Sequence, residues 1–427
     1  MMTLEPETDQ YADVPHLSFL SQPTGDPAID SDLQYIRTLN WAETAPGPIS
    51  TWPRELLVLI NLAMLSPQPQ LFLLGPESII LYNTAYGRLL RDCHPLYQGR
   101  PVSLNTALIA QEPAIDRIKR RARERSALAN EQHIVFFFPQ DGHLEEVFLS
   151  ATMVQLPLAL DGFHATTYDT TKYAVQTRRE QSMDHIRHAC KHADDLITLW
   201  ASLLDGISRG DGDIAFAAVF YADSELIHEK ETDFVYKEVS AQEFLLAGSV
   251  GSFPTPLPAK INRSSGQTWI ETLFKAVDTH SAELLQPLPL EMSHASRNRC
   301  YGDDCLQAVI LPSVLDRAAS VHAVLIVGLA PRRPYDSSYQ AWIRTLHHKF
   351  CNDVASITIS EARVLAKAND NKRLARKKEG FAKVVHLKQQ EAALATGKIR
   401  RMLEIMEAAR FVLHLLCGSI PDFNPIA

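Results

Sequence analysis

The stretch QLFLLGPESIILYN, residues 70–83, holds the clearest fold signal in the sequence. Gln70 to Leu74 is an apolar run, Gly75-Pro76-Glu77 is a tight turn, and Ser78 to Asn83 is a second apolar run. Two short apolar runs joined by a turn of glycine and proline are typical of a β-hairpin. The stretch therefore predicts part of an antiparallel sheet.

Helices and further strands are expected on both sides of this hairpin. Upstream, Ser50 can cap a helix that has Pro53 in its first turn and ends before Pro67. Downstream, Asp141-Gly142 is a strong hairpin signal between two apolar runs. The downstream elements expected are helices at Thr84–Leu90 and Glu112–Leu128, then strands at His133–Phe138, Leu144–Leu156 and Gly162–Tyr168. This order predicts an antiparallel sheet with helices on one face.

The second half of the chain repeats the mixture of strands and helices. One long helical stretch is expected from Lys172 to about Leu204, and the pattern blurs from Asp223 to Pro289. The strands expected are Ile214–Tyr221, Leu306–Pro312 and Val321–Leu329, the last two as antiparallel neighbours, followed by a helix over Tyr335–Ala362.

The chain of 427 residues exceeds the size at which one hydrophobic core stops growing, so several domains are expected. The fold class predicted is α+β, with two antiparallel-sheet domains followed by a long helix of the coiled-coil type. The divisions expected are a disordered leader at 1–30, a first domain at 31–172, a second domain with a leading helix at 173–356, the long helix at 357–410, and an irregular tail at 411–427.

The long helix carries apolar residues at heptad-like spacing. Lys378 and Lys388 interrupt the stripe, and Gly380 and Gly397 each weaken the helix by about 1 kcal/mol relative to alanine. The pattern indicates an imperfect coiled coil, so a homodimer is expected. The residues expected in the dimer helix are Leu374, Phe381, Val385, Ile399, Met402 and Met406.

Charge is uneven along the chain. The net charge is −8, yet residues 361–410 hold 13 Lys or Arg against 6 Asp or Glu. The basic run Arg373–Lys378 has no interleaved aromatic residues, so a solvated flank of the coiled coil is the favoured interpretation and nucleic-acid binding is only a third hypothesis. The acidic pairs Glu145-Glu146 and Asp194-Asp195 are also expected to be solvated.

The sequence indicates a cytoplasmic protein. Its first residues lack the basic region and apolar core of a secretory signal, and its longest apolar stretches are shorter than the ~20 residues of a membrane span. The 6 cysteines are expected to be reduced thiols, because Cys300 and Cys305 lack a second pair at zinc spacing.

No catalytic, cofactor or metal site is expected. The sequence lacks the GxxxxGK[ST], GxGxxG and HExxH motifs. His386 is followed by leucine and lysine where a phosphoaccepting histidine needs an acidic neighbour, and no glycine-rich phosphate loop follows. His185, His188 and His192 share a helical face, but no carboxylate or cysteine is placed to complete a metal site.

The first half resembles the N-terminal PAS-like input domain of fungal and bacterial hybrid histidine kinases. The matching residues are Asn40-Trp41, Gly47 to Pro53, Leu65 to Pro69, Gly75-Pro76-Glu77, Leu81 to Tyr86, His94-Pro95, Gly99-Arg100-Pro101 and Glu145 to Phe148. The second half is similar to the GAF domain that follows in that family, most clearly over Leu325 to Asp336. Related full-length proteins are histidine kinases, but no kinase core follows the helix here. A truncated gene, a splice product and a kinase-less relative all stay open.

The resemblance implies sensory input to a phosphorelay, with phosphorelay proteins as partners and a small molecule as a possible ligand. A non-catalytic dimerising scaffold is the alternative. A ligand-filled cavity would favour the first hypothesis, and packed cores the second. The residues expected to line a cavity in the first domain are Leu71, Leu73, Ile80, Tyr82, Phe136 and Phe148.

Overall fold

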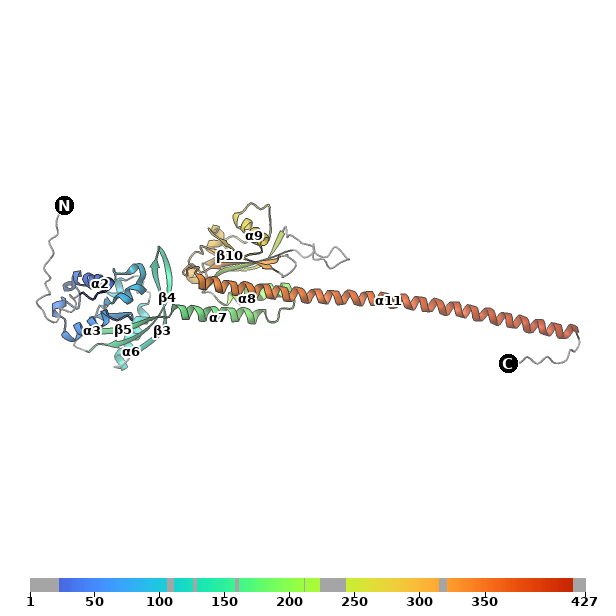
Figure 1. Cartoon of the computed structure of the whole chain (residues 1–427), viewed down its shortest axis with the longest axis horizontal. Coiled ribbons are helices and arrows are strands. Elements are labelled where there is room, and N and C mark those ends of the chain that lie inside the picture. The colour runs from blue at the N-terminus through green and yellow to red at the C-terminus, as the bar shows by residue number, and fades with distance from the viewer. Residues whose placement is uncertain are drawn as a thin grey trace. The chain divides into compact units, whose positions relative to one another are not determined.

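The computed structural model describes residues 23–105, 111–125, 129–157, 161–210, 212–222, 243–314 and 321–417 (Figure 1). These residues form two antiparallel sheets, their covering helices and a long C-terminal helix, so the predicted α+β class is confirmed. The chain divides into two units, residues 1–355 with both sheets and residues 356–427 with most of the long helix. None of the helices in the described ranges combines the length and apolar character of a membrane span.

The first sheet has the strand order β2-β1-β5-β4-β3. Leu71 of β1 pairs with Tyr82 of β2, which confirms the hairpin predicted from residues 70–83. The strands of this sheet are β1 (Gln70–Leu74), β2 (Ile79–Tyr82), β3 (Ala129–Gln140), β4 (His143–Gln155) and β5 (Gly162–Asp169).

Helices cover both faces of this sheet, so the prediction of helices on one face was wrong. Leu71 and Leu73 belong to a core that includes residues of α4 (Thr84–Leu90) and α6 (Glu112–Arg125). Their neighbours Phe72 and Leu74 point the other way, into a core shared with α2 (Pro27–Thr38) and α3 (Arg54–Met64). Burial on both faces explains why β1 is apolar at nearly every position instead of alternating.

Two helices, α7 (Thr171–Cys190) and α8 (Leu196–Ser208), follow the first sheet. The sequence predicted a single helix over this stretch, and that prediction was wrong. Asp195 starts the second helix through a capping box, in which its carboxylate accepts from the Thr198 backbone nitrogen at 2.7 Å.

The second sheet has the order β8-β7-β6-β11-β10-β9 and packs α9 (Thr268–Thr279) and α10 (Leu290–Ser293) into its core. Leu311 pairs with Leu325, confirming the predicted neighbours. Residues 223–242 of the blurred stretch lie outside the described residues. The strands are β6 (Ile214–Ala222), β7 (Glu243–Val250), β8 (Lys260–Asn262), β9 (Glu283–Leu285), β10 (Ala308–Val314) and β11 (Val321–Leu329).

The last helix, α11, runs from Ser337 to Cys417. Its beginning is buried in the first unit, where Phe350 contacts Trp200 of α8 with 6.0 Å between ring centroids. Residues 411–417, which the sequence placed in an irregular tail, are helical. Residues 27–30, which it placed in a leader, form the first turn of α2, and residues 1–22 and 418–427 lie outside the described residues.

Short 3-10 turns connect these elements. They are η1 (Trp41–Glu43), η2 (Ile49–Thr51), η3 (Arg91–Cys93), η4 (Val102–Leu104), η7 (His294–Ser296) and η8 (Cys300–Gly302). Pro53 occupies the N-cap position of α3, whereas the sequence placed the cap at Ser50.

Candidate functional site

A buried carboxylate lies on the outer face of the first sheet. Strands β3 and β4 send alternate side chains to opposite faces, and Phe136 and Val147 enter the apolar core. Glu146, next to Val147, therefore points away from that core, yet it is only 1% exposed. A carboxylate buried to this degree requires charged or hydrogen-bonding partners.

Glu146 receives these partners from the second half of the chain. Arg178 of α7 donates two parallel hydrogen bonds to its carboxylate, at 2.8 and 3.0 Å. The Tyr301 hydroxyl in η8 also donates to the carboxylate. The Glu146 backbone nitrogen donates to the Arg332 carbonyl at 3.0 Å, and the Arg333 guanidinium donates to the Glu146 carbonyl at 2.9 Å. Both the side chain and the backbone of Glu146 are thus fixed.

The chain of contacts continues to the start of the long helix. Asp213, 2% exposed and just before β6, accepts from Arg178 Nε at 2.7 Å and from Arg179 Nε at 3.1 Å. The Arg179 guanidinium lies 4.3 Å from the ring centroid of Tyr339 in α11. The Tyr339 hydroxyl donates to the Asp213 carbonyl. We call Glu146, Arg178, Asp213, Arg179 and Tyr339 the Glu146 network.

The network balances its charges, with two carboxylates against two guanidinium groups. Burial acts to lower the pKa of Arg178, but its hydrogen bonds to Glu146 and Asp213 outweigh this and raise the pKa above its ordinary value. Burial and the hydrogen bond to Glu146 raise the pKa of Tyr301. Removing one member of such a network leaves an uncompensated buried charge, which costs about 3–5 kcal/mol.

Aromatic rings cover one side of Glu146. The Arg332 guanidinium lies 4.0 Å from the ring centroid of Phe137, the cross-strand neighbour of Glu146. Phe137 and Tyr301 meet edge to face at 4.9 Å, and Arg332 also pairs with Asp303. These groups restrict water access, which strengthens the charge interactions beneath them.

The sequence missed this site because it treated Glu145-Glu146 as a solvated pair. That prediction was wrong for Glu146. Glu145 points to the other face and lies 3.6 Å from Arg91. Strand alternation next to Phe137 and Val147 could have shown that the two carboxylates face opposite ways, but nothing local shows that a distant Arg178 covers one of them.

Only some of the residues expected to line a cavity do so in the structure. Leu71, Leu73 and Phe136 line a small apolar cavity of about 40 Å³. Ile80 and Tyr82 are fully buried in the same core but do not line it. Phe148 lies on the opposite face, with the Arg178 guanidinium 5.7 Å from its ring centroid.

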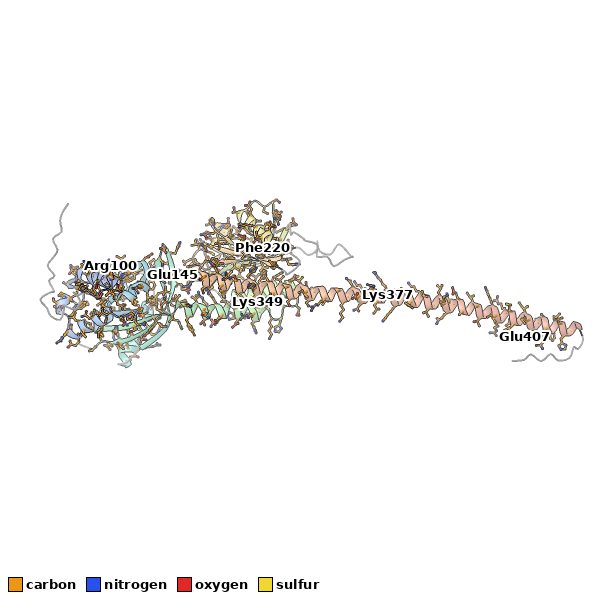
Figure 2. All side chains as sticks on the ribbon, in the orientation of Figure 1. Arg100, Glu145, Phe220, Lys349, Lys377 and Glu407 are labelled. Atoms are coloured by element: carbon orange, nitrogen blue, oxygen red, sulfur yellow. The ribbon has the colours of Figure 1, made fainter. Side chains whose placement is uncertain are left out.

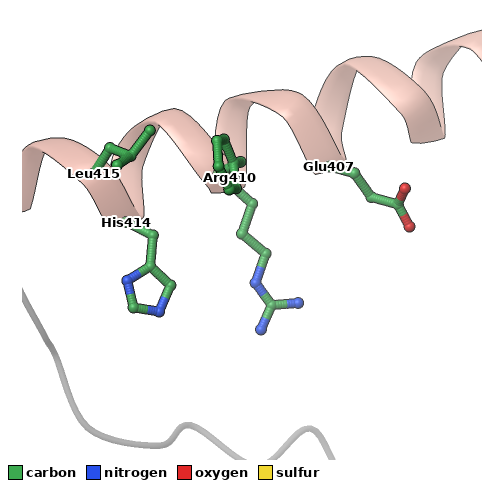
Figure 3. Close-up of a pocket in the computed structure, with 5 residues that line it drawn as sticks. Glu407, Arg410, His414 and Leu415 are labelled. Atoms are coloured by element: carbon green, nitrogen blue, oxygen red, sulfur yellow. The ribbon is translucent and has the colours of Figure 1, made fainter.

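The residues expected in the dimer helix all lie on the exposed part of α11. Their exposed fractions range from 50% at Val385 to 76% at Phe381. Near the end of this helix, Glu407, Arg410 and His414 project from one side and border an open groove of about 400 Å³ (Figure 3). Every residue that borders the groove belongs to α11 and is exposed, so it is a helix surface and not an enclosed site.

The remaining titratable candidates from the sequence are three histidines and two cysteines. Within the described ranges, no three His, Cys, Asp or Glu side chains lie close enough to hold a metal ion, so His185, His188 and His192 do not form such a group. Cys300 and Cys305 are buried and do not form disulfides, and burial raises the pKa of Cys305 to about 12. These thiols are therefore protonated at neutral pH.

Comparison with known proteins finds similarity to solved structures only. No family model and no curated protein matches the chain. The GAF domain of an Acinetobacter phosphoenolpyruvate-protein phosphotransferase is similar at 12% identity and a TM-score of 0.27, covering 43% of this chain and 95% of that one. A putative GAF sensor protein from Burkholderia vietnamiensis is similar at 12% identity and a TM-score of 0.29, with 44% and 92% covered. The chromophore-binding domain of Stigmatella aurantiaca bacteriophytochrome is similar at 11% identity and a TM-score of 0.26, with 69% and 96% covered.

Proposed function

We propose that the chain is the sensory input and signal-relay module of a phosphorelay system, without a catalytic centre of its own. In this proposal a PAS-like domain occupies residues 31–172, a GAF-like domain residues 173–356, and α11 is the output helix. The observation that carries the proposal is the Glu146 network, because it joins β4 of the first sheet to the first turn of α11 through direct hydrogen bonds of buried groups.

The network provides a physical route for a signal. A displacement of β4 moves Glu146, and Arg178 must either follow it or lose a paired charge. Arg178 also holds Asp213, whose carbonyl accepts from Tyr339 in α11. Because a buried ion pair is costly to open, the connected elements favour discrete arrangements over gradual ones. Input at the first sheet would thus change the position of the output helix.

The size of the core cavity bears on the kind of input. Its volume of about 40 Å³ is far below the 300–1,000 Å³ of ordinary ligand sites. So small a cavity favours a protein partner that binds the surface of the first domain over a small molecule that binds inside its core. A small-molecule signal would first have to open the space between Leu71, Phe136 and the α6 residues Ile115 and Ile118.

The proposed output state is a homodimer joined along α11. Ile399, Met402 and Met406 are each more than half exposed, although apolar side chains at heptad spacing normally pack against a second helix. The same stripe is also what a non-catalytic dimerising scaffold would use. The two candidates differ in whether the Glu146 network changes α11 or merely holds the fold together.

Glutamine at position 146 separates these candidates. Glu146→Gln removes one buried charge with little change of shape, while Glu145→Gln removes the neighbouring, less buried charge as a matched control. We expect hydrogen exchange at the first turns of α11, around Tyr339, to speed up at least tenfold in Glu146→Gln only. A folded Glu146→Gln protein with unchanged exchange there would rule out the relay and leave the scaffold.

Incubation with labelled ATP tests the proposed lack of catalysis. We expect no ATP hydrolysis and no acid-labile phosphate on the protein, because His386 lacks an acidic neighbour. Acid-labile phosphate that is lost in a His386→Gln variant would show that the chain is a phosphoacceptor.

A further inference from the structure

One stretch of α11 is far more basic than the rest of the helix. Residues 361–388, which we call the basic segment, hold nine Lys or Arg against three Asp or Glu, whereas residues 389–417 hold four against three. All nine cations are exposed. They are Arg363, Lys367, Lys372, Arg373, Arg376, Lys377, Lys378, Lys383 and Lys388.

Few of these charges are neutralised within the helix. Lys383 pairs with Glu379 at 2.9 Å, and Lys388 with Glu391 at 3.2 Å. In the described part of the chain, no carboxylate lies within ion-pair distance of the other seven cations. A continuous helix of 28 residues is about 42 Å long at 1.5 Å per residue, so its positive field is dense.

The cations surround the helix instead of sharing one face. Successive residues of a helix are about 100° apart, so Arg376, Lys377 and Lys378 project in three different directions. Figure 2 shows side chains standing out on both sides of the helix near Lys377. Lys378 and Lys388 also fall in the heptad positions of the apolar stripe.

This placement argues against two common partners of a basic helix. A helix that lies on a membrane keeps its cations on one face and its apolar residues on the other. A helix paired with a copy of itself excludes like charges from the seam, but Lys367, Lys378 and Lys388 would each meet their own counterpart there. An anionic partner that reaches both sides of the helix at once fits better.

We propose that the basic segment binds the phosphate backbone of duplex DNA, with the helix lying in the major groove. That groove is about 12 Å wide, admits one α-helix and has a phosphate strand along each side. Cations on opposite sides of one helix can therefore contact both strands. Contacts to phosphate carry no base information, so the binding is largely independent of sequence.

The end of α11 is suited to hold two such helices together. From Ala392 to Leu413 the heptad positions contain no charged residue: they are Ala392, Ala395, Ile399, Met402, Met406, Ala409 and Leu413. If two copies pair along these positions, their basic segments diverge from the coiled coil like a fork, and each can lie in the major groove of the same DNA duplex. The fork rests on the homodimer proposed above, but phosphate binding by the basic segment does not.

The test uses the full chain and a fluorescently labelled duplex of 30 base pairs of mixed sequence. Anisotropy titrations at 50 and 200 mM salt should show binding that weakens by about 10³-fold if six phosphates are contacted. Replacing Arg373, Arg376 and Lys377 by alanine should weaken binding at least tenfold. It should also make the slope of log K against log salt concentration shallower by about 2.7 for three lost contacts.

The matched control removes three cations beyond the basic segment. Lys398, Arg400 and Arg401 replaced by alanine gives the same change in net charge on the same helix, and wild-type DNA affinity is expected. Equal losses in both variants, or no binding at 50 mM salt, would overturn the proposal. So would tight binding to vesicles of anionic phospholipid without binding to DNA. Sedimentation of each variant measures dimerisation separately from DNA affinity. Loss of the dimer, on which the fork depends, can therefore be distinguished from loss of phosphate binding by the basic segment.

Discussion

Trp52 shows how single side chains close the first domain. Its ring meets that of Trp41 edge to face, with 5.0 Å between centroids, and both rings are nearly fully buried. Trp52 Nε1 donates to the Gly47 carbonyl at 2.9 Å, while Trp41 Nε1 donates to the Ile36 carbonyl at 2.8 Å. The two tryptophans therefore tie the turn-rich entry segment to the sheet, since both belong to the core that contains Phe72 and Leu74 of β1.

Replacing Trp52 by alanine should lower the free energy of unfolding by about 3–5 kcal/mol, because it leaves a large cavity and removes the edge-to-face contact. Urea unfolding of the full chain measures this loss. Trp52→Phe, which keeps an aromatic ring, should lose clearly less. An alanine variant that melts within a degree or two of wild type would contradict the burial of this ring.

His164 should make stability depend on pH. Its ring stacks on Phe72 with 4.5 Å between centroids, and burial lowers its pKa below the ordinary 6.5. Below pH 6.5 the unfolded chain thus binds a proton that the folded chain does not, so the free energy of unfolding falls as the pH decreases. The slope stays below about 1.4 kcal/mol per pH unit, because the partly exposed ring is screened by solvent.

Urea unfolding at pH 7.5, 6.5 and 5.5 checks this dependence. His164→Gln should be less stable than wild type at pH 7.5, having lost the stacked ring, but should lose less stability on acidification. His185→Gln, at an exposed position on α7, is the control and should retain the wild-type slope. Identical slopes in wild type and His164→Gln would mean that His164 titrates normally.

At the scale of the elements, α7 and α8 approach so closely that only glycine fits between them. A Cβ added to Gly206 would lie 2.7 Å from the Ile186 Cα and 3.3 Å from the Ala189 Cβ. Gly206→Ala should therefore push the helices apart and destabilise the protein by about 1–2 kcal/mol, despite the better helix propensity of alanine.

Gly380 on α11 is the matched control for this substitution, since its added Cβ meets no atom within 4 Å. Gly380→Ala should stabilise its helix by up to about 1 kcal/mol, because only the propensity difference remains. Thermal unfolding followed by circular dichroism measures both variants. A Gly206→Ala protein more stable than wild type would show that α7 and α8 are not in close contact.

Local signals predicted elements well where the deciding contacts are local. The short helix over Thr84–Leu90 was correct because Asn83 caps it, accepting from the Tyr86 backbone nitrogen at 2.9 Å. The break between α7 and α8 was missed, although the Asp195 cap was visible in the sequence, because the apolar pattern on both sides looked continuous. The helices on the second face of the first sheet were missed for a different reason. A short apolar run such as β1 does not show whether one face of the strand is buried or both.

At the scale of the whole molecule, the order of the two sheets and the long helix could be predicted from the sequence, and the contacts between distant segments could not. Two sheets and a long helix follow from runs of apolar residues and their spacing. The Glu146 network joins residues far apart in the chain, and Glu146 lies 155 residues from Tyr301. The residue pattern within one segment does not predict its contacts with a distant segment. The candidate site was therefore found only in the structure, whereas the apolar stripe of α11 could be found in the sequence.

The stripe of α11 leads to the prediction on oligomeric state. Ile399 and Met402 are 60% and 64% exposed and lie on one face of the helix. An isolated helix gains little from such residues, and a second copy of the same helix is the simplest partner that buries them. The charged positions Lys378 and Lys388 weaken the seam, so a modest, concentration-dependent dimer is expected.

Changing Ile399 and Met402 to aspartate should convert this dimer to a monomer while both sheets stay folded. Four carboxylates would then face one another across the seam, and burying them costs more than the remaining apolar contacts return. Leu387→Asp with Leu394→Asp is the matched control, because these residues are 60% and 69% exposed but lie outside the heptad seam. Sedimentation equilibrium over a range of concentrations decides the matter. A wild-type monomer at high concentration, or a dimer that survives the Ile399 and Met402 changes, would exclude this helix as the interface, whereas loss of the dimer in that variant alone would locate it there.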